Sequence, residues 1–205
     1  EYADMQLIAE SYLLLKYVGG FNNQELAHIF KSWNDGELHS YLIGITAGIF
    51  READDLGDGE LIDRIKDSAK QKGTGRWASI EALKQGVDIS MITSACTARI
   101  MSNHLDEREK AWQLIHSPAV GLSPDKESFA AMVREALYTG KIIAYAQGFS
   151  LMQDASRLYG WNLDLGKIAS IFRAGCIIQA VFLNDITHAF EAEPKPENLI
   201  FDGFF

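Results

Sequence analysis

The feature that most constrains the fold is a long helical pattern that ends at Tyr159 and spans about nine helical turns. Ser123 offers an N-cap, Pro124 suits the first helical position, and Gly160 ends the pattern. Apolar residues recur along it at spacings of three and four, as they do on the buried face of a helix. The predicted buried residues are Phe129, Met132, Val133, Ala136, Leu137, Gly140, Ile143 and Ala144. The pattern predicts one very long helix over about residues 125–159.

The rest of the chain shows shorter helical patterns and nowhere the apolar–polar alternation of a half-buried strand. These patterns predict helices over residues 4–18, 22–33, 38–50, 61–70, 77–85, 89–103, 107–116 and 165–190. The 38–50 pattern is apolar on most faces, which predicts a central position for that helix. The predicted fold class is therefore all-α, a multi-helix domain with one very long helix.

Composition excludes several classes of function. With 205 residues, of which 47% are apolar and 23% charged, the chain suits a globular domain with a sizeable core. Its net charge of -9 argues against a general nucleic-acid binder. The longest apolar run, Cys176 to Leu183, is too short to span a membrane. The two cysteines and the isolated histidines lack metal-ligand spacing, so we expect no metal site and a reduced, cytoplasmic protein.

A glycine-rich loop before Trp77 has the composition of an anion-binding site. Gly73 and Gly75 let the backbone approach a ligand closely. Thr74 between them supplies a hydroxyl, and Lys72 supplies a positive charge. Trp77 opens the next helical pattern, so backbone N–H groups would point towards a bound ligand. The alternative is that the two glycines only separate two helices.

The same loop also fits, loosely, the glycine pattern of a dinucleotide-binding fingerprint, as Gly73-x-Gly75-x-x-Ala78. That fingerprint requires a preceding buried strand. Residues 61–71 instead have a charged helical pattern, so we reject the match.

Arg99 lies in a helical pattern and shares the spacing of its core-facing residues, which predicts that Arg99 also faces the core. These residues are Ile92, Ala95, Cys96 and Ile100. A buried charge is costly unless it is paired or binds an anion. We therefore interpret Arg99 as part of an anion site. The alternative is that its side chain reaches solvent or pairs with an internal acid.

The segment from Gln71 to Trp77, preceded four residues earlier by Asp67, resembles the signature of the 6-phosphogluconate dehydrogenase family. Further blocks resemble that family in the same order along the chain. They are residues 1–8, 37–46, 145–149 and 173–178. The resemblance covers essentially all 205 residues and implies the all-helical C-terminal domain of that family.

The resemblance implies a reaction of the pentose phosphate pathway and of gluconate utilization. In it, 6-phosphogluconate is oxidised with NADP, the 3-keto intermediate loses CO2, and ribulose 5-phosphate is released. The chemistry requires a base on the C3 hydroxyl and an acid at C1 of the enediol. Glu1 and Tyr2 match the second half of the family's Gly-Ile-Glu-Tyr segment, which implies that Glu1 is the acid. The implied substrate-binding residues are Tyr2, Lys72, Thr74 and Arg99. Without the resemblance, Glu1 also suits the first turn of a helix, and Tyr2 could merely flank the core.

Other parts of the family's site do not occur in these 205 residues: the general-base lysine, the Rossmann domain that binds NADP, and the C-terminal tail. We therefore expect residues 1–205 to be the substrate-binding and dimerisation domain of a longer protein, inactive as an isolated piece. No residue is assigned to the cofactor, although Gly73 and Gly75 lie near the site. The resemblance also implies a homodimer, with the exposed parts of the 38–50 and 165–190 helices as the expected contact.

Two alternative functions remain open. One is a non-catalytic helical dimerisation domain that has kept the fold and lost the chemistry. The other is a sister hydroxyacid dehydrogenase that acts on an unphosphorylated acid. The joint presence of Lys72, Thr74 and Arg99 favours a phosphorylated substrate over both, because neither packing nor an unphosphorylated acid requires all three.

Overall fold

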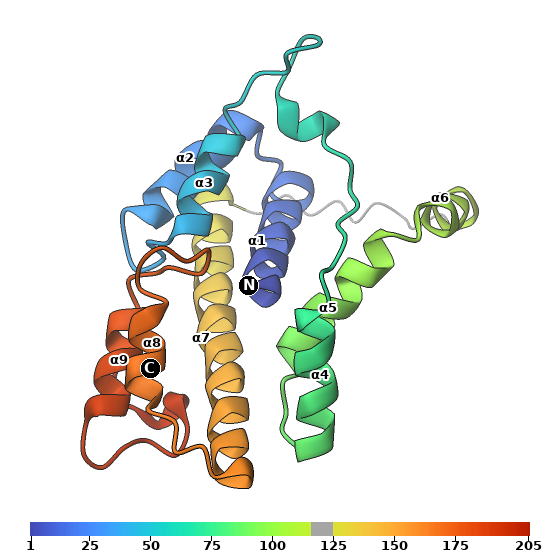
Figure 1. Cartoon of the computed structure of the whole chain (residues 1–205). Coiled ribbons are helices and arrows are strands. Elements are labelled where there is room, and N and C mark those ends of the chain that lie inside the picture. The colour runs from blue at the N-terminus through green and yellow to red at the C-terminus, as the bar shows by residue number, and fades with distance from the viewer. Residues whose placement is uncertain (116–124) are drawn as a thin grey trace.

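The computed structural model describes residues 1–115 and 125–205. Figure 1 shows the helices α1 (Tyr2–Leu13), α2 (Asn23–Asn34), α3 (Tyr41–Ile49), α4 (Thr74–Gln85), α5 (Ser90–Ser102), α6 (Leu105–Leu114), α7 (Lys126–Tyr159), α8 (Leu165–Ile171) and α9 (Leu183–Glu191). Single turns of other helix types lie at Leu14–Val18, Leu61–Arg64 and Leu199–Phe201. In the described residues the only β-type pairings are two isolated bridges, Ser40 with Ala180 and Ala53 with Glu60. The all-α prediction is confirmed.

Helix α7 is the predicted long helix. Asp125 is its N-cap, because the carboxylate accepts a hydrogen bond from the backbone N–H of Ser128. The predicted N-cap Ser123 and the following Pro124 lie outside the described residues. Gly160 ends the helix in the left-handed conformation at φ +66°, which glycine adopts without side-chain strain.

Only part of the face predicted to be buried on α7 is buried. One stripe of predicted residues is covered: Val133, Leu137, Gly140 and Ala144. A second stripe is exposed: Met132, Ala136 and Ile143. The two stripes lie about 100° apart around the helix. Because apolar residues occupy both, their spacing predicted a wider buried face than the neighbouring helices cover.

Two hydrophobic clusters pack against α7. One joins Val133 and Leu137 to α1, α2 and α3, and it includes Leu15, Leu26, Phe30, Ile43 and Phe50. The other joins Ala146 and Phe149 to α8 and α9, and it includes Leu165, Ala169, Leu183, Ile186 and Phe190. In Figure 1, α8 and α9 lie on one side of α7, and α1 and α5 lie on the other. None of the described helices combines the length and the apolar character that crossing a membrane requires.

The predicted 38–50 helix is shorter and less central than expected. Ser40 caps α3 by accepting a hydrogen bond from the backbone N–H of Ile43, so the buried Leu38 lies in the turn before the helix. The residues of α3 that the rest of the chain leaves exposed include Tyr41, Ile45 and Ile49. The helix is therefore covered on one face, mainly by α2, and not on all sides.

The predicted 61–70 helix is wrong beyond its first turn, Leu61–Arg64. Ile65, expected to face inward, is 54% exposed. The backbone that follows bonds to the end of α5 instead of to itself. The Ala69 N–H donates to the Ser102 hydroxyl at 3.0 Å, and the Asn103 amide donates to the Ala69 carbonyl at 2.8 Å. These partners are distant in sequence, so local periodicity could not reveal them.

The predicted 165–190 helix is two helices, α8 and α9, separated by an irregular connection. Gly175 adopts φ +65° in this connection, and only glycine takes that conformation readily. The connection bonds to the turn before α3: the Tyr41 N–H donates to the Gln179 carbonyl, and the Val181 N–H donates to the His39 carbonyl. These bonds replace the intrahelical bonds that a continuous helix would make.

Candidate functional site

The glycine-rich loop forms the start of helix α4. Gly73 precedes the helix with φ +104°, a conformation that disfavours any other residue. Thr74 is the first helical residue, three positions before the predicted start at Trp77, whose N–H donates to the Gly73 carbonyl at 3.0 Å. The first N–H groups of a helix have no intrahelical acceptor. The start of α4 therefore offers N–H donors and the positive end of a helix dipole to an anion.

Tyr2, the first residue of α1, contacts this loop directly. Its hydroxyl accepts a hydrogen bond from the backbone N–H of Lys72 at 3.3 Å. Its ring lies against Gly75: a Cβ atom built at Gly75 would lie 3.0 Å from two ring carbons of Tyr2. The same Cβ would lie 3.4 Å from the Cys96 sulfur. A side chain at Gly75 would therefore require Tyr2 to shift by a few tenths of an ångström, since α1 and α5 approach the start of α4 closely.

Arg99, on α5, lies over the ring of Tyr2. Its guanidinium carbon is 3.8 Å from the centroid of the Tyr2 ring, a cation–π stack. One guanidinium nitrogen donates to the Lys70 carbonyl at 3.5 Å, and another lies 3.4 Å from the Met5 sulfur. The prediction that Arg99 is buried in the core is wrong, because the side chain is only half-buried. Arg99 lies in the last turn of α5, where its side chain contacts Tyr2 and Met5 of α1.

The structure therefore brings most of the predicted site residues together. Tyr2 joins the Lys72 backbone, the Gly75 backbone and the Arg99 guanidinium. The side chains of Lys72 and Thr74 are exposed at the same loop, where they can reach a ligand from solvent. The arrangement can bind a multiply charged oxyanion through an ammonium, a guanidinium, two hydroxyls and backbone N–H groups. No described contact tests the assignment of these residues to a substrate, so it remains a prediction.

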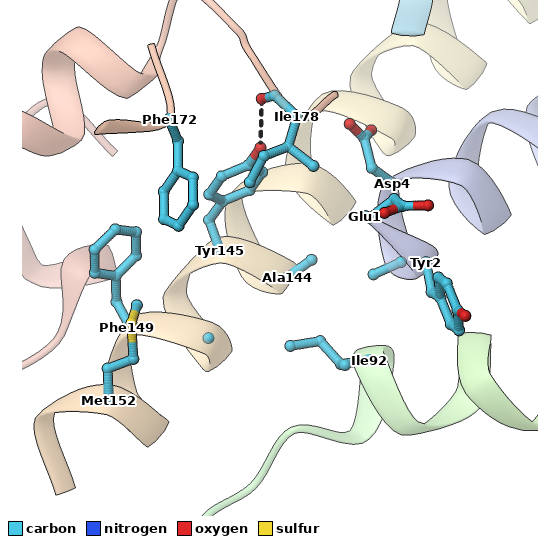
Figure 2. A pocket seen from close by; sticks show the side chains of 12 residues that line it. Glu1, Tyr2, Asp4, Ile92, Ala144, Tyr145, Phe149, Met152, Phe172 and Ile178 are labelled. Carbon is cyan, nitrogen blue, oxygen red and sulfur yellow. Dashed lines mark hydrogen bonds between the residues drawn. The ribbon is translucent and has the colours of Figure 1, made fainter. Parts of the chain in front are cut away.

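Glu1 lies beside Tyr2 at the mouth of a cavity of about 170 Å³. Figure 2 shows Glu1 and Asp4 at one end of this cavity and Phe149, Met152 and Phe172 at the other. Glu1 is exposed, and its side chain does not cap α1. Its carboxyl group is therefore available to a ligand that also touches Tyr2.

Tyr145 also lines the cavity, between Glu1 and the aromatic end. Its hydroxyl donates a hydrogen bond to the Ile178 carbonyl at 3.0 Å, as Figure 2 shows. Burial raises the pKa of the Tyr145 hydroxyl far above its ordinary range, so the phenol stays neutral. The neutral hydroxyl is a hydrogen-bond donor inside the cavity, and Glu1 supplies an exposed carboxyl group at the cavity's end.

Lys141 was not among the residues predicted from the sequence. It lies on α7 between Leu137 and Ala144, at spacings of four and three, and it is fully buried. Its ammonium is 2.5 Å from a carboxylate oxygen of Asp4, which is also buried. The signal was present in the sequence as a lysine on the buried stripe of a long helix, where a charge requires a partner.

The described residues do not fit a dinucleotide site. The segment before Gly73 is irregular: it is not the strand that the fingerprint requires, and the helix predicted there is absent beyond Arg64. Tyr2 and Cys96 pack directly against Gly75. Within residues 1–115 and 125–205, no three His, Cys, Asp or Glu side chains are grouped as metal ligands.

Comparison with known proteins agrees with this fold. The family model described as "6-phosphogluconate dehydrogenase, C-terminal domain" matches residues 1–205. The chain is 50% identical over 205 residues to the decarboxylating 6-phosphogluconate dehydrogenase of Lactococcus lactis subsp. lactis, covering 100% of this chain and 43% of that protein. It is 48% identical over 206 residues to the NADP(+)-dependent decarboxylating enzyme of Bacillus subtilis, covering 100% of this chain and 44% of that protein.

A solved structure gives the same result. Plasmodium falciparum 6-phosphogluconate dehydrogenase, studied in its apo form, with its cofactor NADP+ and with its substrate 6-phosphogluconate, matches with a TM-score of 0.95. The sequence identity is 42%, and the match covers 100% of this chain and 44% of that one. The chain thus spans less than half the length of these relatives.

Proposed function

Because this chain belongs to the 6-phosphogluconate dehydrogenase family, we propose that the protein containing it oxidises and decarboxylates 6-phosphogluconate to ribulose 5-phosphate with NADP. In this proposal residues 1–205 supply part of the substrate site. The observation that carries the proposal is the meeting of Tyr2, the Lys72 loop and Arg99 at the start of α4. Such a site suits the phosphate end of the substrate.

The phosphate would be held by several groups of different character. The N–H groups at the start of α4 and the Thr74 hydroxyl donate to its oxygens. Lys72 adds a mobile point charge from the exposed side of the loop. The planar guanidinium of Arg99 can donate two parallel hydrogen bonds, and its stack on Tyr2 limits its orientations. These contacts bind and orient the substrate without taking part in bond breaking.

Glu1 would act at the other end of the substrate. After oxidation at C3, loss of CO2 leaves an enediol whose C1 must receive a proton. The Glu1 carboxyl group lies beside Tyr2 and is open to solvent on one side of the cavity, so it can donate that proton and be reprotonated. The base that takes the C3 hydroxyl proton has no counterpart among the described residues of this proposed site.

NADP accepts the hydride from C3 when it is bound. The described residues do not form its site, so we assign NADP binding to the part of the protein outside residues 1–205. The chain matches 43% of the Lactococcus relative, which leaves room for such a domain. In this proposal residues 1–205 are one substrate-binding and dimerisation domain that does not catalyse the reaction alone.

A homodimer is part of the proposal. Exposed apolar residues lie on α3, at the end of α8 and on the connection between α8 and α9, the regions expected to make the contact. They are Tyr41, Ile45, Ile49, Ile171, Ile177 and Val181. Exposed apolar patches of this kind commonly mark protein interfaces. We place the protein in the cytoplasm, in the pentose phosphate pathway and in gluconate utilization.

A substrate panel tests the proposed reaction. The full-length protein is supplied with NADP and either 6-phosphogluconate or unphosphorylated gluconate, and NADPH and CO2 are measured together. We expect both products from 6-phosphogluconate and much less of either from gluconate. Turnover that prefers gluconate would favour a sister hydroxyacid dehydrogenase. A lack of turnover with either acid, under NADP and NAD alike, would favour a non-catalytic dimerisation domain.

A further inference from the structure

A buried ion pair lies directly beneath the first turn of α1. The Lys141 ammonium, on α7, is 2.5 Å from one carboxylate oxygen of Asp4, and the two side chains are 0% and 5% exposed. The ammonium also lies 5.9 Å from the ring centroid of Phe182, at the start of α9. The pair therefore connects α1 to α7 at a point where α9 also approaches.

The hydrogen bonding of this pair is incomplete. The second carboxylate oxygen of Asp4 is buried and has no hydrogen-bond partner among the residues that the structure describes. Burying two charges costs more than their attraction returns unless their remaining hydrogen-bonding groups are satisfied. Apolar residues of similar size would therefore hold α1 on α7 at least as firmly. A contribution to stability does not explain why charged residues occupy these two positions.

The ion pair has a direct geometric connection to the proposed site. Asp4 lies in the turn that Glu1 opens, and the Met5 N–H closes that turn by donating to the Glu1 carbonyl at 3.0 Å. One turn further along, Leu7 packs against Gly140, where a Cβ would come within 2.8 Å of a Leu7 methyl carbon. Asp4 and Leu7 thus fix the position of α1 along α7, and the hydrogen bond of Asp4 adds a direction that apolar packing lacks.

We propose that Lys141 and Asp4 are positioning residues, which set the first turn of α1 so that Glu1 and Tyr2 meet the substrate. The inference rests on the proposed function. Lys141 acts through Asp4, and neither residue transfers a proton. A turn that is free to shift along α7 would displace the Glu1 carboxyl from C1 and the Tyr2 hydroxyl from the Lys72 loop. A misplacement of about 1 Å between reacting groups can reduce the rate of an enzymatic reaction about a hundredfold.

The test replaces the ion pair with an apolar pair, Asp4→Leu with Lys141→Met, in the full-length protein. Thermal melting, kcat, and the KM values for 6-phosphogluconate and NADP are measured. We expect the melting temperature to be kept, kcat to fall by about tenfold or more, and the KM for NADP to stay unchanged. Exchange of the Met5 amide hydrogen should become faster, because the turn that it closes is no longer held.

The matched control is Leu26→Ala, at a fully buried residue of α2 that is remote in sequence from the first turn of α1. It should lower the melting temperature and leave kcat and Met5 exchange near wild type. The inference would be overturned if the Asp4→Leu, Lys141→Met variant kept both kcat and the Met5 exchange rate within about twofold of wild type. It would also be overturned if kcat fell in proportion to the loss of melting temperature in both this variant and Leu26→Ala. If the wild-type protein lacks turnover, the proposed function fails, and Met5 exchange decides the positioning claim by itself.

Discussion

The guanidinium of Arg99 stacks on the ring of Tyr2, with its carbon 3.8 Å from the ring centroid. The hydroxyl of the same tyrosine accepts a hydrogen bond from the Lys72 backbone at 3.3 Å. One side chain thus connects α1, α5 and the loop before α4. A guanidinium held over an aromatic ring is restricted in position, and its planar set of N–H donors suits an oxyanion.

The first prediction concerns the shape of this cation. Arg99→Lys keeps the positive charge but loses the planar fork and the stack on Tyr2. We expect the KM for 6-phosphogluconate to rise roughly ten- to a hundredfold, since a charge-assisted hydrogen bond contributes about 1.5–3 kcal/mol. The fall in kcat should be smaller. Steady-state kinetics of the full-length protein measure both values. A lysine variant with wild-type KM would show that Arg99 contributes only charge.

The second prediction concerns Gly75. In Gly75→Ala the new methyl group would lie 3.0 Å from the Tyr2 ring, so the ring must move away from the loop. We expect weaker binding of 6-phosphogluconate, measured by calorimetry. Gly36→Ala is the control, because its methyl group would lie 3.8 Å from the nearest atom, an ordinary contact. Unchanged affinity in Gly75→Ala would mean that the position of Tyr2 does not matter for binding.

The third prediction concerns the proposed acid. Glu1→Gln keeps the size and hydrogen-bonding ability of the side chain but cannot donate a carboxyl proton. We expect kcat to fall by about 10²–10⁴-fold with little change in substrate affinity. Glu10→Gln, at an exposed residue of the same helix, should behave like wild type. A Glu1→Gln variant that keeps its kcat would remove Glu1 from the proposed chemistry.

The sequence predicted the long helix and the site loop better than it predicted their surroundings. Helix α7 was predictable because its periodicity is local and continuous, and Gly160 ends it where expected. The irregular segment of residues 65–72, which leads to the site, was not predictable. Its Ala69 N–H bonds to the Ser102 hydroxyl and not to a helical neighbour. Arg99 was placed in the core by its spacing, but spacing does not reveal that its side chain stacks on Tyr2 at the start of α1 and stays half-buried.

The residues of the site were found by resemblance, and their geometry came from the structure. Nothing in the spacing of Tyr2, Gly75 and Arg99 shows that they touch, because each lies on a different helix. Lys141 could have been noticed as a charge on a buried stripe. Its partner Asp4 could not, because the predicted first helix placed no constraint on which neighbour that aspartate faces.

The fourth prediction concerns stability against acid. The pKa of Glu25 lies below its ordinary value of 4.5, because its carboxylate accepts a hydrogen bond from the Asn22 backbone and another from Lys126. A carboxylate with a lowered folded-state pKa stabilises the fold above its unfolded pKa, and that stabilisation is lost as the pH falls through the folded pKa. Acidification below pH 4.5 should therefore lower the melting temperature of wild type more than that of Glu25→Gln. Equal acid sensitivity of the two proteins would contradict this.

The most direct test of the central claim is the rate of NADPH formation by the full-length protein at varied 6-phosphogluconate, for wild type, Lys72→Ala, Arg99→Ala and Lys84→Ala. Lys84 is the control: it is an exposed lysine in the last turn of α4, at the opposite end from the Lys72 loop, and it pairs with Glu81 at 3.7 Å. We expect wild type and Lys84→Ala to turn over alike, and the other two variants to need roughly ten- to a hundredfold more substrate for half-maximal rate. Lys72→Ala and Arg99→Ala variants with the wild-type KM would contradict the assignment of this loop to the substrate phosphate.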